Sequence, residues 1–182
     1  MEMKKKLFGV ILAAALVVTQ AVTVFAAGSR TSDVALAGDS ASNYEVYEAS
    51  AESFAAVSAQ APQTVDAILE INSGSASLGS LVETIRGLIS AGSSEVNMTE
   101  DQVAALEAEL TGKSLVSNFF EISPVGNGAQ DENGNYVVTL SVPSLTESMT
   151  NVRLLHYSTE RALWEVVTPS DVNYGSQTVT AA

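Results

Sequence analysis

The sequence predicts an α+β fold in which two or three short N-terminal helices precede a small antiparallel β-sandwich. Two observations carry this prediction. Between Pro62 and Gly112, apolar residues recur at steps of three and four, which is the period of an amphipathic helix. From Leu115 onward the period shifts toward two, and turn residues separate five short strand-like segments. A chain of 182 residues is expected to hold one such domain plus tails.

The chain is expected to divide into four segments. Residues 1–26 are a predicted secretory signal peptide, and residues 27–61 a flexible tether rich in Ser, Ala and Glu. Residues 62–112 form the helical segment, and residues 113–182 form the β-sandwich module.

The signal peptide is predicted from the charge and hydropathy of the N-terminus. Lys4, Lys5 and Lys6 precede an apolar stretch from Leu7 to Val18, and Val24-Phe25-Ala26 supplies small residues at the usual positions before a cleavage site. We expect cleavage after Ala26, with Ala27 as the alternative site. The competing hypothesis is an uncleaved membrane anchor. Polar residues interrupt the apolar run before it reaches the length of about 20 residues that a membrane span needs; they are Thr19, Gln20 and Thr23.

The predicted tether contains few large apolar residues. Tyr44, Val46, Tyr47 and Phe54 are the main ones, and a short helix is expected near Ala49 to Ala59. A recognition segment around Tyr44 to Tyr47 is the alternative interpretation of this composition.

Three helices are predicted in the middle of the chain. Pro62 suits the first position of one that ends at Asn72 to Gly74. The second runs from about Leu78 to Ser90, with either Ser77 or Ser80 as its cap.

The third helix has the clearest start. Thr99 is the expected N-cap, and Gln102 is placed to complete a capping box. Met98 and Val103 stand at the positions of a hydrophobic staple, and Gly112 ends the helix.

A hairpin from Asn151 to Pro169 is the expected centre of the β-sandwich. In its second strand Trp164 and Val166 share one face, and Glu165 lies on the other. Trp164 is the best candidate for the core because of its large apolar area. In the first strand, either Val152, Leu154 and His156 or Leu155 and Tyr157 face inward. We favour a strand whose two faces are both partly covered. Further strands are predicted at Leu115 to Ser123, Tyr136 to Val142 and Gln177 to Thr180.

The charge and the absence of cysteine argue against nucleic-acid binding and exclude cysteine-dependent chemistry. The formal net charge is −13. Loss of Glu2 and of the three lysines at 4–6 reduces 21 acidic and 8 basic residues to 20 and 5, a net charge of −15. Such a chain is expected to avoid nucleic acid. With no cysteine, it has no disulfide, thiolate metal site or cysteine nucleophile.

Two polar motifs are candidate functional sites. Asp131, Asn133 and Asn135 offer alternating oxygens, as a calcium loop does, but the loop lacks its closing Glu, and Asn-Gly favours a hairpin turn. His156, Ser158 and Glu160 alternate along a strand, yet a catalytic triad requires convergent geometry that sequence proximity does not supply. We therefore expect no catalytic residue, no metal and no cofactor.

Four aromatic residues are candidates for a ligand-binding platform. Tyr136, Tyr157, Trp164 and Tyr174 would serve a sugar or a peptide if they were exposed together. The competing interpretation is that Trp164 fills the core and the tyrosines are half-buried.

The last third of the chain resembles the immunoglobulin-like β-sandwich modules at the C-termini of secreted and cell-surface proteins of Gram-positive, clostridial-type bacteria. The residues that carry this resemblance are Asp131 to Tyr136, Val138 to Pro143, Asn151-Val152, His156 to Ser158, Trp164 to Val166 and Val179 to Ala181. The resemblance implies an accessory, non-catalytic module. It also implies a further strand beyond the one at Val179, so an open sheet edge that recruits another copy or a partner's strand is expected.

These observations predict a secreted or surface-associated, non-catalytic module rather than an enzyme. The alternative is a carbohydrate- or peptide-binding domain that uses exposed aromatic residues. Expected partners are another protein chain or a glycan at the cell surface. No membrane span is expected after signal cleavage.

Overall fold

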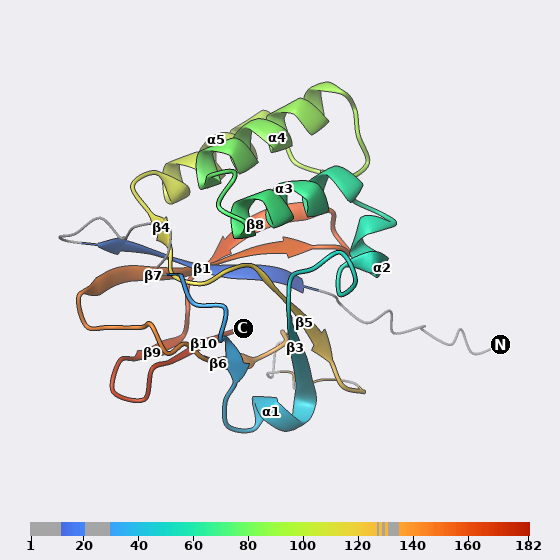
Figure 1. The fold of residues 1–182 in the computed structure, drawn as a ribbon. Helices are drawn as coiled ribbons and strands as arrows, with labels where there is room; N and C mark the ends of the chain where they lie inside the picture. The colour runs from blue at the N-terminus through green and yellow to red at the C-terminus, as the bar shows by residue number, and fades with distance from the viewer. Residues whose placement is uncertain (1–11, 21–29, 127, 129, 131–134) are drawn as a thin grey trace.

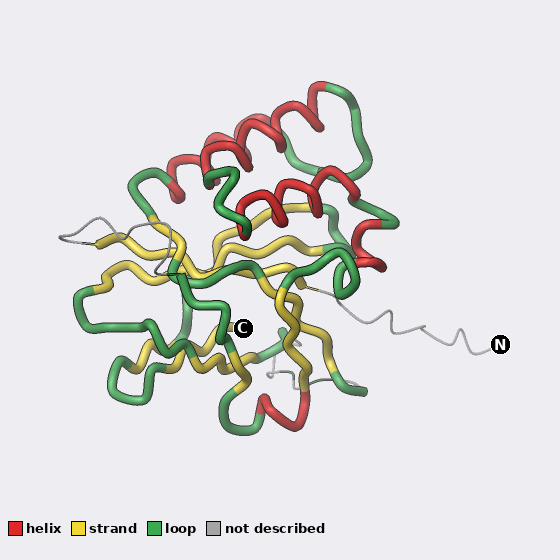
Figure 2. The backbone as a smooth tube through the Cα atoms, viewed as in Figure 1, coloured by secondary structure: helices red, strands yellow, loops and turns green. Residues whose placement is uncertain are grey.

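The computed structural model describes residues 12–20 and 30–182, except 127, 129 and 131–134. Helices and antiparallel sheets coexist, so the chain has a mixed α+β fold. Figure 1 shows the longer helices above the larger sheet and the smaller sheet below it, and Figure 2 shows these longer helices gathered on one side of the strands.

The larger sheet is antiparallel and has the order β3-β5-β1-β7-β8. Its strands are β1 (Leu12–Gln20), β3 (Tyr44–Glu48), β5 (Phe120–Pro124), β7 (Met149–Ser158) and β8 (Leu163–Val167). The short β4 (Ser114–Leu115) pairs with β1 beside β5.

The smaller sheet is also antiparallel and has the order β2-β6-β10-β9. It contains β2 (Ala35–Leu36), β6 (Val138–Ser141), β9 (Asp171–Asn173) and β10 (Thr178–Ala181).

Three helices form the layer above the larger sheet. They are α3 (Pro62–Asn72), α4 (Leu78–Ser90) and α5 (Glu100–Leu110); α1 (Ser40–Asn43) and α2 (Ala55–Ser58) are single turns. Of the described helices, none is both long enough and apolar enough to cross a bilayer.

Two clusters of buried side chains lie on opposite faces of β7. The helix–sheet core joins the helices to Leu155, Tyr157 and Trp164. The inter-sheet core joins Val152 and Leu154 to side chains of the smaller sheet. Both faces of the first hairpin strand are therefore covered, and the predicted alternation in β8 is observed, with Trp164 facing the helices.

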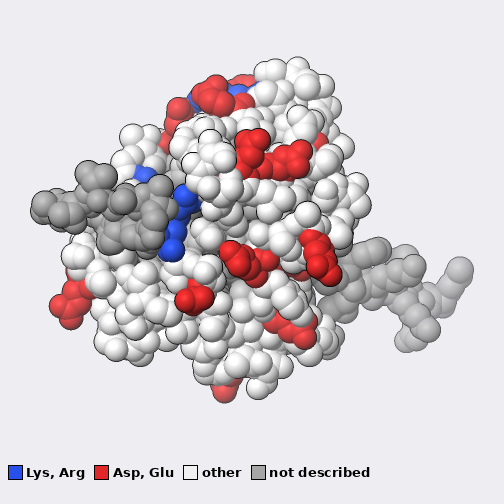
Figure 3. Space-filling model, in the orientation of Figure 1, with Lys and Arg blue, Asp and Glu red and all other residues white. Residues whose placement is uncertain are grey.

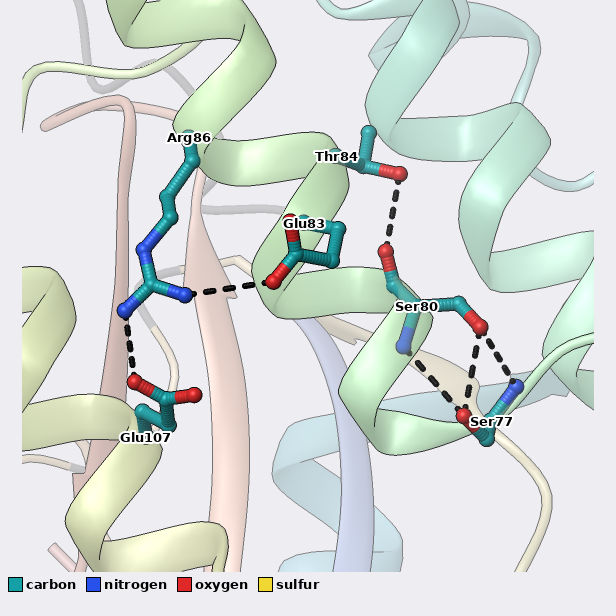
Figure 4. A network of polar contacts seen from close by, with 6 residues as sticks. All are labelled: Ser77, Ser80, Glu83, Thr84, Arg86 and Glu107. Carbon is teal, nitrogen blue, oxygen red and sulfur yellow. Dashed lines mark hydrogen bonds and ion pairs between the residues drawn. The ribbon is translucent and has the colours of Figure 1, made fainter.

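Polar contacts fix the start of α4 and join its middle to α5. Ser77, not Ser80, is the N-cap, and the two serines form a reciprocal capping box. Arg86 then bridges Glu83 at 3.2 Å and Glu107 of α5 at 2.5 Å (Figure 4). These exposed ion pairs orient the two helices but contribute little free energy.

Helices α5 and α3 begin in different ways. The capping box predicted at Thr99 and Gln102 is present at α5. No side chain of the N-cap residue Ala61 caps α3; instead Glu95, 31 residues away, accepts a hydrogen bond from the Thr64 backbone N–H at 3.1 Å. A distant carboxylate thus supplies the acceptor that the local sequence lacks.

Residues 30–61 differ from the flexible tether that the composition predicts. β2 pairs with β6, and β3 pairs with β5. Tyr44 is buried in the inter-sheet core, and Phe54 and Val57 are buried in the helix–sheet core. The few large apolar residues of this segment are enough to anchor it, because nearly all of them find a place in one of the two cores.

The segment Leu12–Gln20 forms β1, in the middle of the larger sheet. It is antiparallel to β5 on one side and to β7 on the other. Of these residues, Leu12 to Val18 belong to the apolar stretch of the predicted signal peptide, and Thr19 and Gln20 follow it. Uncharged aliphatic residues suit a strand in the middle of a sheet as well as a signal peptide, so composition alone does not separate the two roles.

Candidate functional site

A hollow of about 400 Å³ opens between the two sheets. Its described lining comes from β3, β5, β7 and β8 of the larger sheet and from the β6 and β10 regions of the smaller one. The polar and aromatic members of this lining are Tyr44, Asn135, Tyr136, His156, Ser158, Glu160, Arg161 and Glu165. We call this the inter-sheet hollow.

His156 is a buried titratable group in this hollow. It lies on β7, pairs with Glu165 across the hairpin, and is 5 % exposed. Its Nδ1 is 3.1 Å from Glu165 Oε1, although the angle is not that of a hydrogen bond. Burial lowers the pKa of His156 to about 4; the charge of Glu165 opposes this change and that of Arg161 adds to it. The imidazole is therefore neutral at pH 7.

Glu165 and Arg161 form the charged rim of the hollow. The Arg161 guanidinium donates a short hydrogen bond to Glu165 Oε1. Arg161 also donates from its backbone N–H to Ser158 Oγ at 3.3 Å and from Nε to the same oxygen at 3.4 Å. These hydrogen bonds hold the hairpin loop against β7, the strand that carries His156.

The structure brings together the three residues that the sequence offers as a candidate nucleophile with a base. His156, Ser158 and Glu160 all line the inter-sheet hollow, as their alternation along the strand predicts. The Ser158 hydroxyl oxygen already accepts hydrogen bonds from Arg161, and the Glu160 side chain is exposed. The polar partner that sequence spacing missed is Glu165, which the hairpin register places opposite His156.

The four candidate aromatic residues do not share a surface. Trp164 and Tyr157 are each 2 % exposed and belong to the helix–sheet core, which corrects the hypothesis of an exposed platform that includes them. Their ring centroids lie 5.3 Å apart, and Phe119 packs edge-on to Trp164 at 5.8 Å. Large aromatic side chains pack a small core more effectively than any other residue type, which explains their position.

Tyr157 has a polar contact that the sequence does not predict. Its hydroxyl donates to the Glu95 backbone carbonyl at 2.7 Å, so it joins β7 to the loop before α5. Burial, with the charge of Glu95 as a smaller cause, raises the pKa of Tyr157 to about 12.

Tyr136 and Tyr174 are half-buried. Tyr136 lines the inter-sheet hollow, whereas Tyr174 packs against the inter-sheet core and donates from its hydroxyl to the Met149 backbone carbonyl at 2.7 Å. Tyr136 is therefore the candidate aromatic residue that remains placed to touch a ligand in the hollow.

Two of the three calcium candidates, Asp131 and Asn133, lie outside the described residues. Asn135 is exposed at the edge of the hollow. A β-bridge pairs Gln130 with Tyr136 across this segment, which is the arrangement expected of a hairpin turn. Within the described part of the chain, no group of three or more acidic or histidine side chains is arranged to hold a metal ion.

Acidic side chains outnumber basic ones on the surface visible in Figure 3. Figure 3 shows Asp and Glu atoms spread over the visible face, with fewer Lys and Arg atoms among them. This distribution agrees with the net charge of −13.

Comparisons with known proteins identify no relative: no family model, no curated protein and no solved structure matches the chain.

Proposed function

We propose that this chain is a secreted or surface-associated, non-catalytic module whose two sheets form a β-sandwich. The observation that carries the proposal is the N-terminus, where the lysines at 4–6 precede the apolar stretch from Leu7 to Val18, and small residues at Val24 and Ala26 suit a cleavage site. The inter-sheet core supports the sandwich, since it buries side chains from both sheets. The resemblance to immunoglobulin-like modules of Gram-positive bacteria supports an accessory role.

The polar residues of the inter-sheet hollow support a non-catalytic role. A histidine with a pKa of about 4 is a weak base at neutral pH, and Arg161 restrains the neighbouring Ser158 hydroxyl. The Arg161 contacts are what a structural role requires, because they satisfy the Ser158 hydroxyl oxygen beside the hollow.

The experiment is N-terminal sequencing of the protein from the culture medium and from the cells of a secreting Gram-positive host that expresses the full chain. We expect released protein that begins at Ala27 or Gly28. Recovery of the chain only in membranes, beginning at Met1, would contradict secretion with cleavage.

A second candidate function is the binding of a carbohydrate or peptide in the inter-sheet hollow. The observation that favours it is a hollow of about 400 Å³ that combines Tyr136 with the charged Arg161 and Glu165. A glycan and peptide array tests it, with Tyr136→Ala as the variant and Tyr47→Ala, at a tyrosine that is 48 % exposed and outside the hollow, as the matched control. Binding that both variants retain would exclude the hollow as the site.

A further inference from the structure

The most informative feature of the larger sheet is that its middle strand belongs to the predicted signal peptide. β1 pairs with β7 from Leu12, opposite Ser158, to Gln20, opposite Met149. On its other side it pairs with β5 at Leu12 to Ala14, and with β4 at Val17 and Val18. No pairing of β5 with β7 is observed among the described strands, so β1 connects the two halves of the sheet.

The partners of β1 define what kind of strand this position accepts. Along β7, Leu155 and Tyr157 belong to the helix–sheet core, whereas Leu154 belongs to the inter-sheet core. The register places alanines opposite Tyr157, His156 and Leu155, and it places a leucine opposite the small Ser158. At these three positions the register therefore pairs alanine with a larger residue, and no charged residue occurs in the 9-residue strand LAAALVVTQ.

Cleavage at Ala26 would remove this strand; the inference therefore rests on the proposed secretion. The facing edges of β5 and β7 would then lose their hydrogen-bond partners. From Leu154 to Ser158, every residue of β7 is buried while β1 is in place, and each of these residues pairs with β1. Such an edge favours the addition of a strand.

We propose that in the released protein the position of β1 is a strand-acceptor slot, bounded by the edges of β4 and β5 on one side and of β7 on the other, that binds an extended segment of a partner polypeptide. The segment is uncharged and mostly aliphatic, about nine residues long, and antiparallel to both β5 and β7. It carries small side chains at the positions that face Tyr157, His156 and Leu155.

The occupant is a partner rather than a second copy of this chain. Apart from the two-residue β4, every described strand after residue 30 keeps a neighbour when β1 is removed. A second copy therefore has no spare strand of this length among the described residues unless it unfolds one of its own sheets.

The first experiment measures binding of a synthetic peptide to the secreted protein. The full chain is expressed in a secreting host, and sequencing first establishes that the released form begins at Ala27 or Gly28. The probe is the peptide LAAALVVTQ with lysines added at both ends for solubility. The control peptide carries proline in place of the residue at Ala14, which removes a backbone donor and hinders strand pairing.

The expected result is stoichiometric binding of the first peptide and a melting temperature raised by about 5 °C at saturating concentration, with no effect of the control. If the released protein melts cooperatively only after the peptide is added, that result also supports the strand-acceptor slot.

The second experiment tests the register by disulfide formation. Because the chain contains no cysteine, only the introduced thiols can react. The slot places Arg153 opposite the position of Val17, and Thr150 opposite that of Thr19. Arg153→Cys is combined with a peptide that has cysteine at the Val17 position, and Thr150→Cys with a peptide that has cysteine at the Thr19 position. These matched pairs should form disulfides about tenfold faster than the two crossed pairs, because a bound strand raises the effective concentration of one thiol near the other.

Three outcomes would overturn the proposal in a correctly processed protein. The peptide neither binds nor changes the melting temperature; the disulfides form without regard to register; or sedimentation shows a dimer that the peptide does not dissociate, which would assign the edge to a second copy. A released chain that still begins at Met1 would instead refute the proposed secretion and, with it, an open slot. The N-terminal sequence therefore distinguishes the two failures.

Discussion

The hairpin formed by β7 and β8 has two chemically different faces. The face toward the helices carries Leu155, Tyr157 and Trp164, which pack against α3, α4 and α5 in the helix–sheet core. The opposite face carries His156 and Glu165 beside Leu154, toward the smaller sheet. Period-two alternation produces both faces from one continuous stretch of chain.

The two faces of the hairpin contribute to stability in different ways, one through apolar burial and the other through a buried titratable group. On the helix side, apolar burial dominates, and the polar contacts are few and directed at backbone atoms, such as that of the Tyr157 hydroxyl with the Glu95 carbonyl. On the inter-sheet side, stability depends on the charge state of His156. Substitutions on the first face should therefore act at every pH, whereas those at His156 should act mainly in acid.

Trp164→Ala should have the largest effect, since it removes the aromatic side chain that contacts both Phe119 and Tyr157. We expect a loss of about 4 kcal/mol in the free energy of unfolding, as for other buried large-to-alanine substitutions. Urea unfolding of the purified protein measures it.

Trp164→Phe is the matched control for this variant. The structure shows no acceptor for the buried Trp164 Nε1 among the described residues, so its N–H contributes no hydrogen bond that phenylalanine would lose. The control should therefore cost much less than alanine. Equal losses for both substitutions would show that the indole shape, rather than the buried apolar area, holds this face together.

On the inter-sheet face, His156→Gln should change the acid sensitivity of the protein. The pKa of His156 is lowered from 6.5 to about 4 in the folded state, so the unfolded chain binds more protons between these values. The stabilisation that comes from keeping the imidazole neutral is therefore complete above pH 6.5 and is lost as the pH falls through about 4. Over that interval the native protein should lose about 3 kcal/mol more than the variant.

Urea unfolding of both proteins at steps from pH 7 to pH 4 measures this difference. Carboxylates common to the two proteins cancel in the subtraction. Parallel curves for the two proteins would show that His156 is accessible to protons in the folded state.

The features predicted correctly from the sequence are those that depend on neighbours in the chain. The capping residues Thr99 and Gln102 satisfy each other within one helical turn, and the alternation around Trp164 needs only the geometry of one strand. The pairing of β7 with β8 joins segments that a short loop connects. A local pattern identifies each of these because the interaction itself is local.

The features that were missed join distant parts of the chain. β3 reaches β5 across more than 70 residues, and the apolar Leu12–Gln20 finds its partners more than 90 residues away. No local period marks such a pairing, so residues 30–61 looked like a tether. In the candidate site, the sequence indicated that His156 and Ser158 share a face. It did not indicate Glu165 as the charged neighbour, because that contact depends on hairpin register.

Glu95→Ala should separate the packing of the helix layer from its distant polar contacts. The carboxylate is buried and accepts hydrogen bonds from the Thr64 backbone at 3.1 Å and from Gln63 Nε2 at 3.3 Å. Its removal leaves the first turn of α3 without a cap, at an expected cost of about 2 kcal/mol. Thermal and urea unfolding measure the loss.

Glu95→Gln is the matched control, because the amide keeps one oxygen that can accept the Thr64 N–H. It should lose less than half as much as alanine. If the two variants are equally destabilised, the charge rather than the hydrogen bond is what α3 requires.

The smallest expected effect belongs to the local cap of α5, and it sharpens the contrast with the distant cap of α3. Thr99 Oγ1 accepts from the Gln102 backbone N–H at 3.3 Å, and Gln102 Oε1 accepts from the Thr99 N–H at 2.8 Å. Both partners are at the surface, where water replaces a lost acceptor, so Thr99→Ala should cost only about 1 kcal/mol. Thr99→Ser keeps the hydroxyl and should be nearly neutral. The loss should not exceed that of Glu95→Ala, because only the latter leaves a buried N–H without an acceptor. Paired urea unfolding of the four variants measures this order; a larger loss at Thr99 would mean that the start of α5, rather than the distant carboxylate, limits the stability of the helix layer.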